Sequence, residues 1–119
     1  MDTQSDPITI TEQGSAYVVQ FAGPRLLDEV VIARSAAQLE ALVRQASGPR
    51  LVLDFAAVEH MSSAALGMLI TVHKQVRQRG GRLALCQVRP GIYEVFAITK
   101  LNEVFQIYHD RTQALAGLA

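Results

Sequence analysis

Three residue types that together can make a nucleophilic catalyst stand close together in the middle of the chain. Asp54, His60 and Ser63 are the acid, base and nucleophile types of a hydrolase triad. A triad needs side chains from separate elements to converge, and in many hydrolases its serine lies in a G-x-S-x-G turn. No such turn surrounds Ser63. We therefore expect that the three residues form no triad and that the protein is not an enzyme.

Metal and cofactor chemistry has equally weak support. His60, His73 and His109 are widely spaced, and no HxxxH, CxxC or paired-carboxylate spacing accompanies them. His73 falls on the apolar side of a predicted helix, which favours a packed side chain over a metal ligand. Cys86 is the only cysteine, so no internal disulfide forms, and its place in a predicted strand favours a buried thiol. Because phosphate-binding glycine motifs are also missing, we expect no metal and no cofactor.

The serine pair Ser62-Ser63 allows two interpretations. Either serine can be an N-cap, whose hydroxyl accepts a hydrogen bond from a backbone N–H of the first helical turn. Alternatively, one hydroxyl points outward and is phosphorylated. A phosphate adds about −1.5 to −2 charge, and a helix N-terminus tolerates an anion because its N–H groups form the positive end of the helix dipole. A partner surface that fits the neutral hydroxyl would then lose affinity.

The serines lie where a predicted strand meets a predicted helix. An apolar run from Leu51 to Phe55 precedes a loop, and a helical period opens within Met61 to Gly67. Apolar residues then recur at three- and four-residue spacing until Gly80-Gly81, where glycine permits the turn that ends a helix. Leu83 to Cys86 follows as a second strand. This pattern predicts a βαβ crossover, which presents polar groups at the strand–helix junction.

The flanking segments complete an α/β pattern. Two β-prone runs around Gln13-Gly14-Ser15 predict a hairpin, and a helical period is clear from about Ala33 to Gly48-Pro49. The C-terminal part predicts a short helix from Ile92 to Ile98, a strand from Val104 to Tyr108, and a helix through Leu118 that is capped by Asp110. We expect an α/β domain over residues 7–119 with a mixed sheet of four or five strands, preceded by a flexible segment, residues 1–6.

Composition excludes several classes of function. The formal net charge is zero and the 11 Lys and Arg residues are scattered, so nucleic-acid binding is not expected. The apolar runs are far shorter than the roughly 20 residues of a membrane-spanning helix, and the first residues lack a signal-peptide pattern. We expect a soluble cytoplasmic protein with no membrane span.

Several motifs occur in a fixed order along residues 51–118: a hydrophobic strand ending in Asp54, the loop Met61 to Gly67, a Gly-Gly turn, a helix started by Pro90, the segment Leu101 to Phe105, and Ala114-Leu115. In this combination the chain resembles the STAS domain of bacterial anti-sigma factor antagonists. The resemblance implies a STAS-like fold with helices packed mainly on one face of the sheet. It also implies a protein that binds a serine kinase of the ATPase fold, which doubles as an anti-sigma factor.

Carried over position by position, the resemblance makes Ser63 the phosphoacceptor and Ser62 the reserve. It implies that phosphorylation breaks the complex with the kinase and that a PP2C-type phosphatase restores it. The residues expected to bind the partner lie at the end of the strand, in the loop and along the following helix: Asp54, Met61, Ser62, Ser63, Ala64, Gly67, Lys74 and Gln75. For Asp54, a local role as a turn carboxylate stays equally open.

A constitutive interaction module is the alternative function. Examples are a stressosome component or the small STAS subunit of a lipid transporter, in which Ser62 and Ser63 only cap the helix. This alternative predicts no dependence on phosphate.

Overall fold

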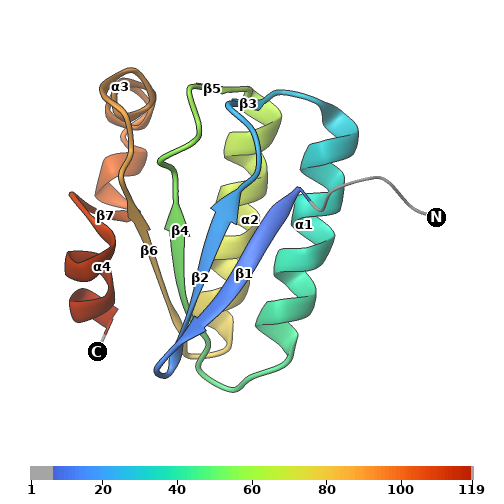
Figure 1. Ribbon diagram of the computed structural model, residues 1–119, viewed down its shortest axis with the longest axis vertical. Helices are drawn as coiled ribbons and strands as arrows, with labels where there is room; N and C mark the ends of the chain where they lie inside the picture. Colours follow the sequence, from blue (N-terminus) through green and yellow to red (C-terminus); the bar gives the residue numbers. More distant parts are fainter. Residues whose placement is uncertain (1–6, 119) are drawn as a thin grey trace.

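The computed structural model describes residues 7–118 and shows a five-stranded sheet with helices on both sides (Figure 1). The strand order is β1-β2-β4-β6-β7; β1 runs antiparallel to β2, and the other neighbours are parallel. The predicted α/β fold with a mixed sheet is confirmed. The segment 1–6 that we expected to be flexible lies outside the described residues. The strands are β1 (Ile8–Gln13), β2 (Ala16–Phe21), β4 (Arg50–Asp54), β6 (Arg82–Cys86) and β7 (Gln106–Tyr108).

β1 and β2 form the hairpin that the sequence predicts. Gln13 pairs with Ala16, and Gly14 adopts a φ of 62°, which glycine tolerates because it has no Cβ. β4 lies in the middle of the sheet, between β2 and β6. Its residues Leu51 to Leu53 are fully buried, because helices cover both faces of this parallel centre.

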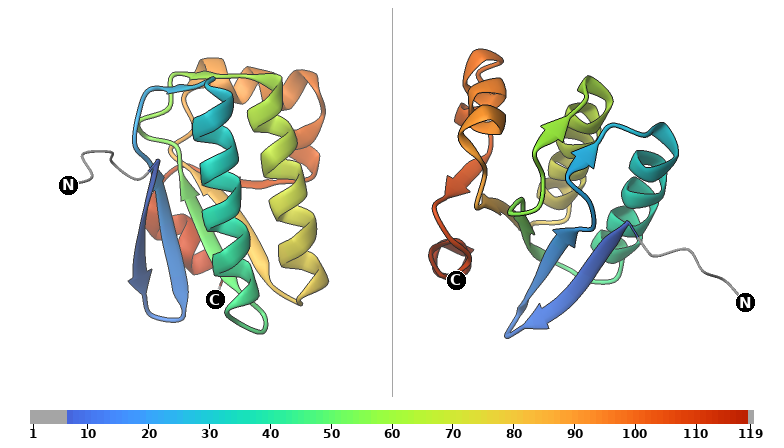
Figure 2. Two further views of the ribbon diagram at one scale, coloured as in Figure 1. Left: turned by 90° about the vertical axis from the view of Figure 1, so that its right-hand side faces the viewer. Right: turned by 45° about the horizontal axis from the view of Figure 1, so that its top comes forward.

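Two long helices cover one face of the sheet (Figure 2). α1 (Glu29–Arg44) and α2 (Ser63–Gln78) pack against each other and bury the main hydrophobic core. α3 (Pro90–Ile98) adds Ile92 and Phe96 to that core. α4 (Arg111–Leu118) lies on the opposite face, over a smaller cluster that contains Val18, Val52, Ala84 and Cys86. The helices therefore lie mainly on one face, as expected.

A polar residue caps the start of each long helix. α1 begins at Glu29, a start that the sequence pattern, clear only from about Ala33, did not place, and the Asp28 carboxylate caps it. Asp28 Oδ1 accepts hydrogen bonds from the N–H groups of Val30 and Val31, at 2.8 and 3.1 Å. α2 begins at Ser63, within the segment Met61 to Gly67 in which the sequence predicts that a helix opens.

The final strand is shorter than predicted. Leu101–Glu103 form a 3₁₀ helix, η1, and β7 begins only at Gln106. Phe105 is buried against Phe96, with ring centroids 5.7 Å apart, so its side chain serves the core and not a sheet ladder. The predicted cap of the last helix is confirmed, because Asp110 Oδ1 accepts a hydrogen bond from the Gln113 N–H at 2.8 Å.

The loops at the end of the sheet remote from the start of α2 are tied together. The Gly48 N–H donates to the Arg79 carbonyl oxygen, and the Arg82 N–H donates to the Pro49 carbonyl oxygen, both at 2.9 Å. A Cβ atom on Gly81 would overlap the Pro49 backbone. This position therefore requires glycine for steric reasons.

Candidate functional site

A two-stranded parallel sheet positions the loop that carries the serines. β3 (Arg25–Leu26) pairs with β5 (His60–Met61). The Ser62 N–H donates to the Leu26 carbonyl oxygen at 3.1 Å, and two other N–H groups of the loop donate to the Pro24 carbonyl oxygen at 2.7 and 3.0 Å. The backbone before α1 therefore holds the backbone before α2. Strands of two residues carry no hydrophobic period, so the sequence analysis missed both.

The two serines occupy different positions at the start of α2. Ser62 is the N-cap: its backbone is extended, with φ −89° and ψ 168°, and its Oγ accepts a hydrogen bond from the Ala65 N–H at 3.2 Å. Ser63 is the first helical residue and is exposed. Within residues 7–118 the Ser63 hydroxyl has no hydrogen-bond partner. The capping interpretation therefore applies to Ser62, and the Ser63 hydroxyl is available to react.

The electrostatics at the start of α2 suit an anion. The first turn of α2 contains no acidic residue, whereas α1 begins with the Asp28 cap followed by Glu29. Among the described residues, no acceptor satisfies the backbone N–H groups of Ser63 and Ala64. The positive end of the α2 dipole is therefore not compensated by charge, and a negative group there is stabilised by about 0.3–1 kcal/mol.

Asp54 is buried, with only 2% of its surface exposed. Its carboxylate accepts hydrogen bonds from the Ala56 N–H at 2.9 Å and from Gln87 Nε2 at 3.4 Å, and it forms an ion pair with Arg111 Nη2 at 2.8 Å. A carboxylate buried in this way has little surface with which to contact a partner directly. Its hydrogen bond from the Ala56 N–H is that of a turn carboxylate, the local role left open for Asp54, and the Arg111 ion pair also links the end of β4 to α4.

The neighbouring Cys86 thiol is also buried. Burial raises its pKa to about 12, and the nearby Asp54 carboxylate contributes to the increase. The thiol therefore stays protonated at neutral pH, as expected for a small buried side chain and not for a reactive nucleophile.

The other residues expected to bind the partner form an exposed stripe along α2. Ser63, Gly67, Thr71 and Lys74 recur at helical spacing and are all exposed. Lys74 lies about 16 Å from Ser63 along the helix axis, at 1.5 Å per residue. The remaining expected residues differ in exposure: Ala64 is exposed, while Met61 and Gln75 are half-buried.

Two exposed hydrophobic residues adjoin the serine loop and were not among the predicted contacts. Leu27, which directly follows β3, is 45% exposed, and Val30, in the first turn of α1, is 65% exposed. Because β3 pairs with β5, they lie at the same end of the molecule as Ser63. We call Leu27, Val30, Ser63, Ala64 and Gly67 the serine face. Recognition of Asp28 as an N-cap would have predicted the position of Leu27 and Val30, because it places them just before and within the first turn of a helix.

Within residues 7–118 the three triad residue types, Asp54, His60 and Ser63, are not joined by hydrogen bonds. No group of three or more His, Cys, Asp or Glu residues in the described chain is arranged to hold a metal ion. His73 packs on Phe105, with ring centroids 5.1 Å apart, and its pKa is lowered by burial and by the nearby Arg77 charge.

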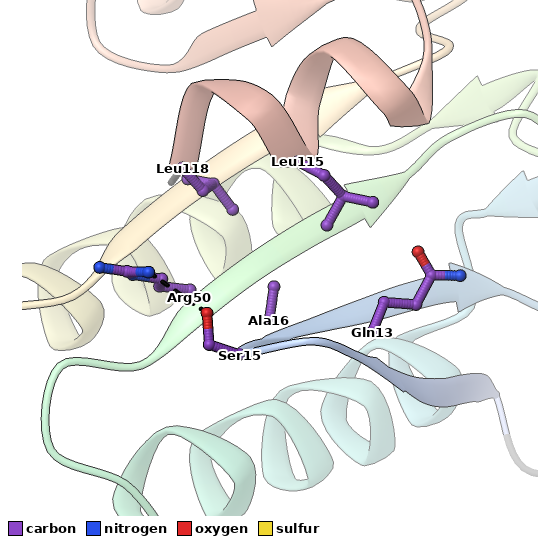
Figure 3. Close-up of a pocket in the computed structure, with 6 residues that line it drawn as sticks. All are labelled: Gln13, Ser15, Ala16, Arg50, Leu115 and Leu118. Atoms are coloured by element: carbon purple, nitrogen blue, oxygen red, sulfur yellow. Dashed lines mark hydrogen bonds between the residues drawn. The ribbon is translucent and has the colours of Figure 1, made fainter.

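A hollow of about 240 Å³ lies beside the β1–β2 turn (Figure 3), and Figure 1 shows this turn at the opposite end of the molecule from the start of α2. It lies between the β1–β2 turn and α4, and Arg50 Nη1 donates across its floor to Ser15 Oγ at 3.2 Å. Leu115 and Leu118 of α4 point toward it. With one charged group that is already hydrogen-bonded and no carboxylate or histidine, it offers little for catalysis.

Comparison with known proteins identifies the family. The family model described as "STAS domain" matches residues 7–114. The chain belongs to the STAS domain family. This STAS protein is 39% identical over 94 residues to BtrV of Bordetella bronchiseptica, which is named as an anti-sigma factor antagonist; the match covers 76% of this chain and 81% of BtrV.

Two further relatives agree with that assignment. The anti-sigma F factor antagonist of Paenibacillus polymyxa is 26% identical over 81 residues, covering 68% of this chain and 69% of the relative. A solved anti-sigma-factor antagonist (STAS) domain protein from Planctomyces limnophilus superposes with a TM-score of 0.84 at 27% identity, covering 94% of this chain and 97% of that one. Within residues 7–118, no helix of this STAS protein is long and apolar enough to cross a membrane.

Proposed function

We propose that this STAS protein is an anti-sigma factor antagonist that binds its partner through the serine face and is released when Ser63 is phosphorylated. The observation that carries the proposal is the difference between the two serines. Ser62 caps α2, so the exposed Ser63 hydroxyl can be modified without loss of a hydrogen bond that the fold uses. The names of the two sequence relatives support the antagonist role.

The helix start explains why a phosphate could act as a switch without unfolding the domain. A phosphate on Ser63 adds about −1.5 to −2 charge beside the N–H groups of Ser63 and Ala64, which donate to no acceptor within residues 7–118, and these groups stabilise the anion. The serine face itself is apolar at Leu27 and Val30. A partner that covers these side chains must also desolvate the phosphate, which costs binding free energy. The phosphate charge therefore leaves the fold stable and lowers the affinity for the partner.

The partners that the STAS resemblance implies fit a cycle of this kind. We assign the modifying enzyme to the serine kinases of the ATPase fold that also bind sigma factors, and the restoring enzyme to the PP2C-type phosphatases. In this cycle the STAS protein acts by binding alone, without catalysis of its own. The cycle takes place in the cytoplasm, where the ATP for the kinase is found.

The test is incubation of the purified protein with ATP and the candidate serine kinase encoded nearest to it, followed by intact-mass measurement and peptide mapping. We expect one phosphate, located on Ser63. Ser63→Ala should take up none, and the matched control Ser62→Ala should still be phosphorylated on Ser63. Phosphate on Ser62 of the wild-type protein would contradict the proposal, because the acceptor would then be the hydroxyl that caps α2.

A binding measurement separates the switch from a constitutive interaction module. In calorimetric titration against the kinase, the unmodified protein should bind and the phosphorylated protein should bind at least tenfold more weakly. Leu27→Asp should weaken binding to a similar degree without any phosphate. Equal affinity of the two forms would favour the constitutive module and would contradict the switch.

A further inference from the structure

The two edges of the sheet differ in how they are protected. β7, at one edge, is three residues long and is flanked by η1 and α4. β1, at the other edge, is six residues long, and no described strand or helix lies beyond it (Figure 2). Proteins usually protect a long edge with charged side chains, lysine above all, with proline or with a bulge. β1, with the sequence ITITEQ, has no lysine, proline or bulge, and its one charged residue is Glu12.

Backbone geometry identifies the groups of β1 that face outward. The Ala22 N–H donates to the Pro7 carbonyl oxygen at 2.9 Å, in line with the register of the hairpin. Backbone groups alternate in direction along an antiparallel strand. The N–H and C=O groups of Thr9, Thr11 and Gln13 therefore bond to β2, and those of Ile8, Ile10 and Glu12 face the free edge.

The side chains of these residues suit pairing with an identical strand. A two-fold axis perpendicular to the sheet, midway between Ile10 of one copy and Ile10 of the other, places the two Ile10 residues opposite each other and Thr9 opposite Thr11. It places Glu12 opposite Ile8, so no two like charges meet. Cross-strand pairs of β-branched residues stabilise antiparallel sheets. Ile10, which is 38% exposed in the single chain, would be covered by its own copy.

We infer that β1 of this protein pairs antiparallel with β1 of a second copy of the chain, so that two five-stranded sheets join into one continuous sheet. The register centred on Ile10 uses the outward backbone groups of Ile8, Ile10 and Glu12 in both copies. Because the axis reverses the strand direction, the two serine faces lie at opposite ends of the joined sheet. Each serine face remains open, so this inference does not depend on the proposed function.

The first test is the molar mass of the full chain in solution, by sedimentation equilibrium over a wide concentration range. The wild-type protein should pass from monomer to dimer as concentration rises. Ile10→Lys should remain monomeric, because two lysines would face each other across the axis. The matched control Ile98→Lys changes an isoleucine on α3 that is 78% exposed, and it should dimerise as the wild type does.

Two results would overturn the inference: a wild-type protein that stays monomeric throughout, or equal dimerisation of Ile10→Lys and wild type, with circular dichroism showing that both variants are folded.

A second test examines the register. Cys86 is buried, so in Ile10→Cys the new thiol at position 10 is the accessible one among the described residues. Residues opposite each other in a hydrogen-bonded antiparallel pair have Cα atoms about 5.5 Å apart, within reach of a disulfide. With copper phenanthroline and oxygen as the oxidant, Ile10→Cys should form a covalent dimer at least tenfold faster than Ile98→Cys. Equal rates would contradict pairing through β1.

Discussion

Asp54 and Ser63 lie at the same end of the sheet, one at the end of β4 and the other at the start of α2, and the fold uses them in opposite ways. Asp54 is buried, and hydrogen bonds from three groups occupy its carboxylate. Ser63 is exposed, and its hydroxyl has no partner within residues 7–118. Both were expected to contact a partner. The difference shows that a polar group available for regulation is one whose hydrogen bonds the fold does not need.

The largest expected effect comes from removal of the Asp54 carboxylate. Asp54→Ala leaves the Arg111 guanidinium and the Ala56 N–H without their partner, and the free energy of unfolding should fall by about 2–3 kcal/mol. The decrease is smaller than for a fully buried ion pair because Arg111 is 31% exposed and can reach water. Urea unfolding followed by circular dichroism measures it. Lys74→Ala, as the control, should change the value by less than about 0.5 kcal/mol.

The free energy of unfolding should depend on pH above pH 9, because the buried Cys86 thiol titrates differently in the folded and unfolded states. The folded state holds the Cys86 pKa near 12, against 9.0 in the unfolded chain. Between these values the folded state binds one proton more, so stability falls as pH rises, by at most about 1.4 kcal/mol per pH unit. Below pH 9 the thiol contributes no slope. Cys86→Ala should remove this part of the decline; an unchanged slope in the variant would contradict the assignment.

The two serines should differ when each is replaced by alanine. Ser62→Ala removes the cap of α2 and should lower the free energy of unfolding by about 1 kcal/mol. Ser63→Ala removes no hydrogen bond and should change it by less than about 0.5 kcal/mol. Both values come from thermal and urea unfolding under the same conditions. The reverse order would mean that the roles of the two serines are exchanged.

The smallest expected effect is a gain in stability from a negative charge at Ser63. Ser63→Asp should raise the free energy of unfolding by about 0.3–1 kcal/mol at low salt, because the carboxylate lies at the positive end of the α2 dipole. High salt should reduce the gain. Ser47→Asp, in an exposed loop outside the helices, is the matched control and should show no such gain. A loss of stability would contradict the tolerance of this helix start for phosphate.

The sequence predicted those elements that are determined by residues within a few positions of one another. The hairpin at Gly14, the βαβ crossover and the Asp110 cap follow from turn residues, apolar period and capping chemistry, all within a few positions. The contacts that the sequence did not reveal join distant segments. Arg111 binds Asp54 from 57 positions away, and β3 meets β5 through strands too short to show a period.

The candidate site shows the same limit at a finer scale. Adjacent serines have the same chemistry, and the sequence cannot say which one caps the helix. The distinction depends on backbone angles: Ser62 is extended, whereas Ser63 already has helical geometry. The Ser62 backbone is held by a contact that the local sequence does not show, the hydrogen bond from the Ser62 N–H to Leu26, far away in the sequence. By contrast, the apolar spacing along α2 did predict which side of the helix is exposed. Lys74 lies on that exposed side, in the same stripe as Ser63.

The overlap between Gly81 and Pro49 affects how a saturation-mutagenesis survey of this protein would be interpreted. Any side chain at Gly81 would push apart the two loops at the end remote from Ser63, so every substitution there would be eliminated by a screen for activity. At Gly67, on the serine face, a Cβ meets nothing within 4 Å, so the fold should accommodate alanine there, and a loss of activity would report on partner binding. Intolerance at Gly81 would therefore record steric fit between two loops at the far end of the molecule, and not recognition of a partner.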